Sequence, residues 1–196
     1  MTKVLTFNVG IEGLEDKICR KIQITDRRTV ADLAYTILAT FDSLAYHLYQ
    51  IKHQNDRYDC MIEPLDLGDY IFKDAVKKKL SDVDFKRDNQ MIMEYDFGST
   101  TTFIITYLGT RDMGEYEGYL YPIIVDGEGR GMLDDIPDFE LKEIVDDIDK
   151  KGYSDHFVTP GYERYEKYDY RKFNIKTNNR KLKGLVLEIK NGYEVG

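Results

Sequence analysis

The sequence predicts an α+β protein. Two observations support this fold class. Segments with strand patterns occur in hairpin-like pairs on both sides of one strongly amphipathic helix, and further helical segments follow only in the C-terminal third. Repeated alternation of strand and helix, which a doubly wound parallel sheet requires, does not appear.

The length of the chain predicts one domain. It has 196 residues, of which 42% are hydrophobic and 33% charged, as is typical of globular proteins. A chain of this size buries about 70% of its unfolded surface without any disulfide or metal. We expect a single α+β domain over residues 1–196, with a flexible joint at 151–161 and a C-terminal helical extension at 162–196.

The N-terminal elements are a hairpin and a helix. Strands are predicted at 4–9 and 18–24, with a polar turn between them. Thr29 then precedes a helix, and Asp32 completes a capping-box pattern with it. The apolar residues of this helix recur at helical spacing: Val30, Leu33, Ala34, Ile37, Leu38 and Phe41. This stripe indicates core packing.

The middle of the chain contains more strands. Alternating patterns predict strands at 47–53 and 58–62, and one or two helical turns are expected within 73–80. A second hairpin joins strands at 90–95 and 101–108.

The turn of this second hairpin is Tyr95-Asp96-Phe97-Gly98. We expect Asp96 to form an Asx-turn and Gly98 to supply a positive φ.

The C-terminal third begins with a strand at 120–125, where Pro122 favours an edge position. An acidic, glycine-rich loop at 126–137 leads to a helix at 138–150. The residues of this helix expected to face inward are Phe139, Leu141, Ile144, Val145 and Ile148. A last helix is expected to begin at Asn178 or Asn179 and to end at Asn191-Gly192.

The net charge and the number of cysteines limit the partners and the cellular compartment expected for the protein. The net charge of −8 and pI of about 5.0 give no general attraction to nucleic acid. Cys19 and Cys60 are too few for a secreted disulfide framework, which favours a reducing compartment. The sequence shows neither a signal-peptide pattern nor 18 consecutive apolar residues, so a cytoplasmic protein without a membrane span is expected.

Three blocks of the sequence resemble the plasmid pRiA ORF-three-like family, whose relatives include passenger proteins of insertion elements. The blocks are the helix 29–41 with His47-Leu48-Tyr49, the Tyr95-Asp96-Phe97-Gly98 turn, and Tyr121-Pro122 through Gly127-Glu128-Gly129 to Asp134-Asp135. The resemblance implies an α/β-roll-like antiparallel sheet packed against helices, and a family without an established activity.

The chain departs from this family at several positions. The family's Asp, Trp and His that follow the hairpin turn are Ser99, Thr101 and Phe103 here. The family's Trp-Arg pair is Cys19-Arg20, and its proline pair before the acidic pair is Met132-Leu133. If those family residues line a ligand site, this chain has lost or changed much of it.

One candidate site is an acidic cleft between the hairpin turn and the acidic loop. Its candidate residues are Asp96, Ser99, Asp126, Glu128, Asp134 and Asp135. Clustered carboxylates bind divalent cations, the one cofactor left open here. The alternative is a solvated loop in which Asp134 or Asp135 accepts hydrogen bonds from local backbone N–H groups, or in which Asp138 caps the next helix.

Other motifs point to no site. Gly127-Glu128-Gly129-Arg130-Gly131 does not fit the dinucleotide fingerprint, because its third glycine comes one residue early. The three histidines, His47, His53 and His156, are too scattered for a zinc motif. On a single strand His47 and His53 would lie about 20 Å apart.

A third reading is a nucleic-acid surface, since aromatic and basic side chains together bind single strands. The candidate residues are Tyr162, Arg164, Tyr165, Lys167 and Arg171. Glu163, Glu166 and Asp169 intervene, however, and indicate ion pairs. Further basic runs are Arg20 and Lys21 with Arg27 and Arg28, Lys77 to Lys79, and Arg180, Lys181 and Lys183.

The favoured hypothesis is an accessory or interaction protein with a protein partner. No set of nucleophile, base and metal ligands stands out, so an enzyme is the less favoured reading. A ligand- or metal-binding cleft at Asp134 and Asp135, and nucleic-acid binding through 162–172, are the alternatives.

Overall fold

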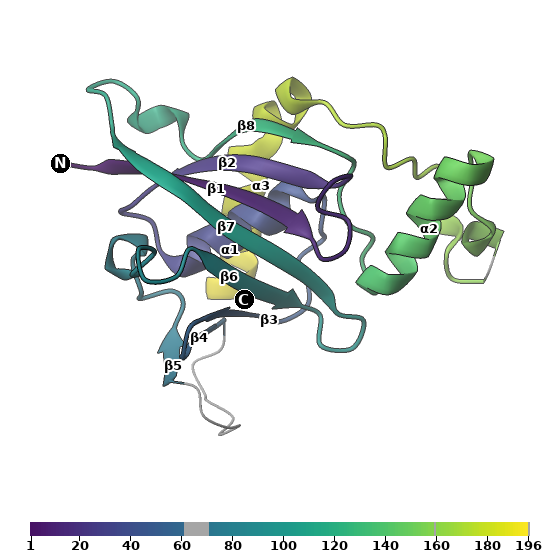
Figure 1. The fold of residues 1–196 in the computed structure, drawn as a ribbon, viewed down its shortest axis with the longest axis horizontal. Helices are drawn as coiled ribbons and strands as arrows, with labels where there is room; N and C mark the ends of the chain where they lie inside the picture. Colours follow the sequence, from purple (N-terminus) through teal and green to yellow (C-terminus); the bar gives the residue numbers. More distant parts are fainter. Residues whose placement is uncertain (61–70, 159, 196) are drawn as a thin grey trace.

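The computed structural model describes residues 1–60, 71–158 and 160–195, and it contains one eight-stranded sheet (Figure 1). The strands are β1 (Lys3–Ile11), β2 (Cys19–Thr25), β3 (Tyr49–His53), β4 (Asp56–Asp59), β5 (Ile71–Asp74), β6 (Gln90–Tyr95), β7 (Thr101–Asp112) and β8 (Ile123–Glu128). Their order across the sheet is β5-β4-β3-β6-β7-β1-β2-β8, and every pair is antiparallel except β4 with β5. The predicted α+β class is confirmed.

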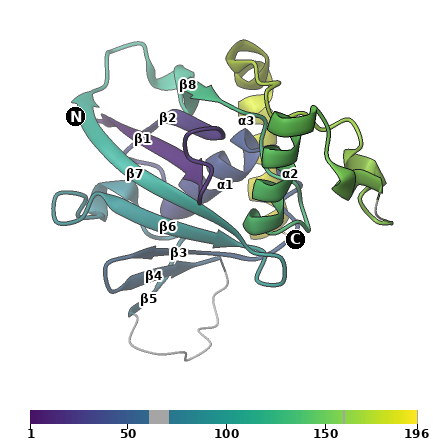
Figure 2. The same cartoon turned by 45° about the vertical axis from the view of Figure 1, so that its right-hand side comes forward.

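In the described residues, three α-helices accompany the sheet: α1 (Val30–Thr40), α2 (Asp138–Lys151) and α3 (Ile175–Glu194). α1 and α3 contact each other behind the sheet, whereas α2 stands beside one end of the strands (Figures 1 and 2). No helix in the described part of the chain is long and apolar enough to cross a membrane.

Helix α1 forms the centre of the core. Thr29 accepts from Asp32 N and the Asp32 side chain accepts from Thr29 N, so the predicted capping box is confirmed. Every residue of α1 is buried, because the sheet covers one side of the helix and α3 covers another. The apolar stripe therefore packs as expected.

The segment before Leu80 differs from its prediction. The helical turns expected within 73–80 are wrong: β5 runs parallel to β4, and a turn follows it. The carbonyls of Ala75 and Lys78 accept hydrogen bonds from the first N–H groups of α1. Those carbonyls are therefore committed to the neighbouring helix rather than to a helix of their own. The end of the predicted strand 58–62 lies outside the described residues.

Helix α2 follows its prediction with one exception. Leu141, Ile144, Val145 and Ile148 are buried, but Phe139 is 63% exposed. The four buried residues already complete one stripe at i, i+3, i+4 and i+7, and Phe139 falls outside it.

The bounds predicted for the last helix are wrong. The side chain of Asn174 accepts from Thr177 N, so α3 starts one turn before Asn178. The helix also continues through Gly192. The ring of Tyr193 stacks on Tyr35 and meets Tyr49 edge-on, and this packing stabilises the last turn.

β8 lies at an edge of the sheet, as Pro122 predicted. The backbone N–H and C=O of Ile124 point away from β2, and the Asn179 side chain of α3 bonds both, at 2.9 and 2.8 Å. The Asn179 amide thus forms the two hydrogen bonds that a further strand would otherwise make with the backbone of Ile124.

Arg20 of β2 is fully buried. Its guanidinium donates to the carbonyls of Thr40, Cys19 and Glu128, and it lies over the ring of Phe173 at 3.6 Å. Burial lowers the pKa of Arg20 to about 10. The expectation that Arg20 contributes to an early basic surface patch is therefore wrong.

Candidate metal centre

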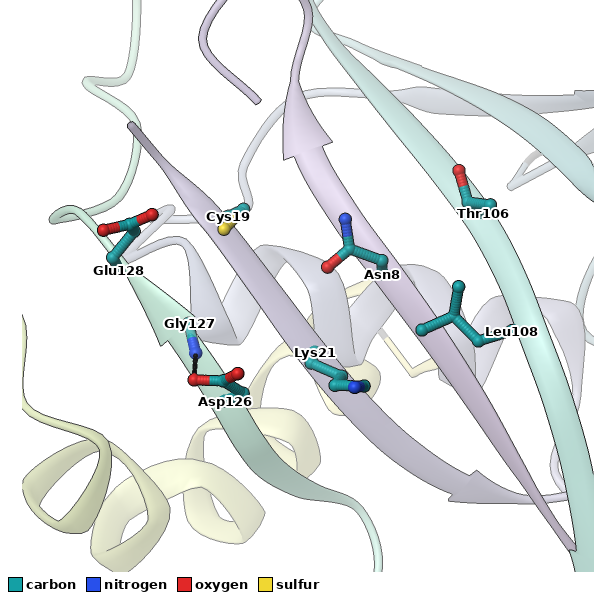
Figure 3. A pocket seen from close by; sticks show the side chains of 8 residues that line it. All are labelled: Asn8, Cys19, Lys21, Thr106, Leu108, Asp126, Gly127 and Glu128. Carbon is teal, nitrogen blue, oxygen red and sulfur yellow. Dashed lines mark hydrogen bonds between the residues drawn. The ribbon is translucent and has the colours of Figure 1, made fainter. Parts of the chain in front are cut away.

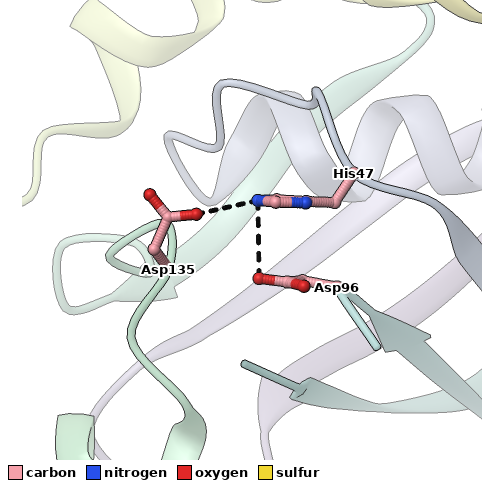
Figure 4. Close-up of side chains that lie close together, drawn as sticks. All are labelled: His47, Asp96 and Asp135. Carbon is pink, nitrogen blue, oxygen red and sulfur yellow. Dashed lines mark hydrogen bonds and ion pairs between the residues drawn. The ribbon is translucent and has the colours of Figure 1, made fainter. Parts of the chain in front are cut away.

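Three segments far apart in the sequence meet at His47, Asp96 and Asp135 (Figure 4). His47 follows α1, Asp96 begins the β6–β7 turn, and Asp135 belongs to the loop before α2. The His47 Nε2 atom lies 2.8 Å from Asp135 Oδ1 and 3.4 Å from Asp96 Oδ2. One ligand atom from each of the three residues lies within 4.8 Å of the others.

Asp96 is held by its own turn. Its Oδ1 atom accepts from Gly98 N at 3.0 Å, which confirms the predicted Asx-turn. The positive φ, however, belongs to Asp96 at 58° and not to Gly98. Asp96 N also donates to Leu48 O at 3.0 Å, which places the carboxylate beside His47. The second oxygen, Oδ2, is left to face the imidazole.

Asp135 is held in the same way from the other side. Its Oδ2 atom accepts from Tyr46 OH and from Arg164, both at 2.6 Å, while Oδ1 faces His47. The Tyr46 hydrogen bond, followed by those of Arg164 and His47, lowers the pKa of Asp135 to about 2. The carboxylate is therefore ionised across the physiological range.

His47 is fixed through its backbone and its ring. His47 N donates to Tyr95 OH at 3.4 Å, and Tyr193 OH donates to His47 O. The imidazole packs against the ring of Tyr46, with centroids 4.3 Å apart, and meets Tyr95 edge-on. Burial raises the pKa of Tyr95 to about 12, so its hydroxyl stays protonated beside the site.

Asp134 has a different position from Asp135. Its side chain is buried and accepts from Ser43 Oγ at 2.9 Å, Leu44 N at 3.0 Å and Tyr95 OH at 3.3 Å. These bonds join the loop before α2 to the loop after α1. Asp134 therefore supports the site without facing it. The expectation of a solvated loop with local backbone bonds is wrong for this residue, because Asp134 is buried and its backbone donor, Leu44 N, belongs to a distant segment.

The predicted acidic cleft separates into two places. Asp126 and Glu128 belong to β8 and line a hollow of about 400 Å³ on the open face of the sheet (Figure 3). The other lining residues are Asn8, Cys19, Lys21, Thr106, Leu108 and Gly127. The expectation that 126–128 are loop residues is wrong, because they pair with β2.

Two further expectations near the site need correction. Asp138 does not cap α2: its carboxylate accepts from Thr102 N at 3.2 Å, and Pro137 stands at the cap position. Thr101 and Phe103 are buried on β7, Phe103 packing against Phe41. In the part of the chain that the structure describes, no hydrogen bond joins Ser99 to the three-residue group.

The tyrosine-rich stretch lies against the loop that carries Asp135. Tyr165 OH donates to Asp134 O at 2.7 Å and Tyr168 OH to Gly131 O at 2.9 Å. Tyr162 OH donates to Glu140 at 2.7 Å, and Arg171 pairs with Asp169. Lys167 is exposed. These hydroxyls hold the loop in place, and nucleic-acid binding by the stretch stays a prediction.

The comparisons with known proteins agree with this fold. The family model of the plasmid pRiA4b ORF-3-like protein matches residues 3–177, a span that contains all three residues of the group. The chain belongs to this family. No biochemical activity is established for the family. Among the curated proteins, none matches the chain.

The chain is also similar to a solved structure, that of a protein of unknown function from Methanosarcina mazei Go1. The TM-score is 0.71 at 22% sequence identity, and the match covers 90% of this chain and 98% of the other. At this identity the likeness supports the fold alone.

Sequence reasoning included Asp96 and Asp135 but missed His47 and Tyr46. The expectation that His47 and His53 share a strand is wrong, since β3 begins at Tyr49 and His53 bonds Asp88 O. The register of β3 with β6 was the available signal. Because Tyr49 pairs with Tyr95 in an antiparallel sense, residues just before 49 must lie beside residues just after 95.

Proposed function

We propose that the chain binds one divalent transition-metal ion, with Zn²⁺ as the favoured ion, through His47 Nε2, Asp96 Oδ2 and Asp135 Oδ1. Zinc accepts imidazole and carboxylate ligands at about 2.0–2.2 Å. The three atoms lie within 4.8 Å of one another, so small side-chain movements suffice to bring them around one ion.

One observation carries this proposal: in each carboxylate, one oxygen accepts a hydrogen bond from a protein donor and the other oxygen faces His47. Asp96 uses Oδ1 for Gly98 N, and Asp135 uses Oδ2 for Tyr46 and Arg164. Hydrogen bonds of this kind orient ligands and hold them ready for a metal. A plain surface ion pair does not need both carboxylates positioned in this way.

The ligand set favours a transition metal over Mg²⁺ or Ca²⁺. Imidazole suits Zn²⁺, Cu²⁺, Fe²⁺ and Ni²⁺ better than the hard cations, which prefer oxygen alone. Three protein ligands leave a coordination position for water or substrate, which is the arrangement of catalytic zinc sites. Arg164 next to Asp135 offsets one negative charge, so we expect weaker binding than at a site without a nearby cation.

The test is metal titration of the purified protein after chelator treatment. We expect one Zn²⁺ per chain by calorimetry, and visible absorption bands on replacement with Co²⁺. His47→Ala and Asp135→Asn should each weaken binding at least about tenfold. Bound metal should also raise the unfolding temperature, because it binds the folded chain.

Asp126→Asn is the matched control. It removes an equivalent carboxylate from β8 and should leave the metal affinity unchanged. Zinc binding that is absent at millimolar concentration, or that survives His47→Ala unchanged, would rule the site out.

A protein partner and a cytoplasmic location stay predictions. The part-buried, unpaired Cys19 and Cys60 support a reducing compartment. The accessory role also stays a prediction, since membership of the family assigns no activity.

A further inference from the structure

Helix α3 and the residues just before it concentrate basic side chains in an acidic protein. Between residues 171 and 187 the sequence has six basic residues and no acidic one, although the whole chain has a net charge of −8. The six are Arg171, Lys172, Lys176, Arg180, Lys181 and Lys183. This segment therefore concentrates positive charge against the sign of the molecule.

Three of these cations form a stripe on the helix. Lys176, Arg180 and Lys183 are exposed and follow one another at i, i+4 and i+7, which places them on one face. The opposite side of α3, represented by Leu182 and Ile189, is buried. The stripe spans about 10 Å along the helix axis.

The stripe is available to a ligand. Lys181 pairs with Asp42, and Arg171 and Lys172 pair with Asp169. By contrast, no described carboxylate pairs with any of the three stripe cations.

An exposed aromatic ring, that of Tyr119, lies next to the stripe. Lys183 donates to the backbone carbonyl of Tyr119, and its ammonium lies 6.0 Å from the centre of the Tyr119 ring. Tyr119 is 74% exposed, and Tyr116 in the same β7–β8 connection is 79% exposed. The contact with Lys183 places the exposed Tyr119 ring beside one end of the stripe.

We propose that this surface, defined by Lys176, Arg180, Lys183 and Tyr119, binds single-stranded nucleic acid. Cations along a track neutralise phosphates, and exposed rings stack on bases without regard to sequence. About 10 Å of helix matches about three nucleotides of a stacked strand. An anionic membrane would also attract the cations, and tyrosine rings occur at membrane surfaces as well. Anionic vesicles are therefore the competing ligand in the test. The proposal is independent of the metal centre.

Binding is measured by fluorescence anisotropy with a labelled 12-nucleotide single strand, of DNA or of RNA, and nuclease-treated full-length protein. We expect a dissociation constant of about 10⁻⁴–10⁻⁶ M at low salt, and a log–log salt slope of about −2 from three phosphate contacts. Lys176→Gln with Arg180→Gln and Lys183→Gln should abolish binding, and Tyr119→Ala should weaken it about tenfold. Circular dichroism checks that each variant folds.

The control variant removes the same charge elsewhere, through Lys86→Gln, Lys142→Gln and Lys150→Gln, all exposed in the wild type. It should bind as the wild type does. An equal loss in the control overturns the proposal in favour of diffuse electrostatics. A protein that binds neither the DNA nor the RNA strand also overturns the proposal. A protein that binds vesicles with 30% phosphatidylserine, but neither of these strands, overturns it as well.

Discussion

At the scale of single residues, the adjacent aspartates Asp134 and Asp135 have different roles. Asp134 is 3% exposed and accepts three hydrogen bonds from residues of two other segments. Asp135 has a left-handed φ of 64° and turns its carboxylate outward to His47, Tyr46 and Arg164. The change of backbone direction at Asp135 separates the supporting carboxylate of Asp134 from the carboxylate that faces His47.

We expect Asp134→Asn to reduce the free energy of unfolding by about 1–3 kcal/mol, because an amide NH₂ replaces an oxygen that accepts from Leu44 N or Ser43. Asp135→Asn should cost less than about 1 kcal/mol, since its partners are partly exposed. Urea unfolding of the metal-free proteins measures both. Equal losses of stability would contradict this division of roles.

At the scale of elements, α3 closes the sheet next to β8. Asn179 bonds both backbone groups of Ile124 and so replaces the peptide unit of a neighbouring strand. Buried or paired edges keep sheets from pairing with other chains. The contact also fixes α3 against the sheet, which positions Tyr193 under His47 at the far end of the same helix.

Asn179→Ala should lower the free energy of unfolding by about 1–3 kcal/mol through two lost hydrogen bonds to backbone groups. Asn178→Ala is the control, because Asn178 bonds only Asn174 O within the helix, and it should stay within about 0.5 kcal/mol of the wild type. Chemical denaturation compares the two, and light scattering detects association through the opened edge. An unchanged Asn179→Ala protein would show that water replaces the amide at no cost.

At the scale of the whole molecule, a charged contact joins the β1–β2 turn to α2. Lys17 Nζ lies 2.8 Å from Asp149 Oδ2, and Tyr170 OH also donates to Asp149. The Lys17 hydrogen bond, and then that of Tyr170, lowers the pKa of the Asp149 carboxyl. Three distant parts of the chain thus share one ionised group.

The sign of the pH dependence follows from this lowered pKa. A carboxyl with a depressed folded-state pKa stabilises the fold above its unfolded pKa, about 3.9, and loses that contribution as the pH falls through the folded-state value. Asp149→Asn should therefore be slightly less stable than the wild type at pH 7, by under about 1 kcal/mol. The difference should vanish near pH 2. Urea unfolding at pH 7 and near pH 2 measures this difference in stability between the two proteins. A difference that grows on acidification would contradict a stabilising, ionised Asp149.

Much of the fold follows from local sequence patterns, whereas the site does not. The capping box of Thr29 and the hairpin strands around Asp96 are encoded within a few residues, so pattern and propensity predict them. The group of His47, Asp96 and Asp135 depends on the pairing of β3 with β6 and on the path of a loop before α2. Contacts of that range leave no local periodicity to detect.

Errors in the predicted elements have the same origin. Residues 73–80 have some helical character, but their carbonyls bond the start of α1, and α3 continues past Gly192 because Tyr193 packs on Tyr35. In both places a contact from a distant segment overrides the local preference.

The buried guanidinium of Arg20 limits how this chain can change over evolutionary time. It serves carbonyls from β2, α1 and β8 at once, and the ring of Phe173 covers it. A lysine side chain lacks the planar guanidinium that donates to three carbonyls at once, and an apolar side chain would leave all three carbonyls without a hydrogen-bond donor. No single substitution at position 20 preserves the three hydrogen bonds to these carbonyls. A substitution of Arg20 therefore requires simultaneous changes in the three segments that supply them. We therefore expect homologous chains to exchange the proposed metal ligands more readily than this arginine.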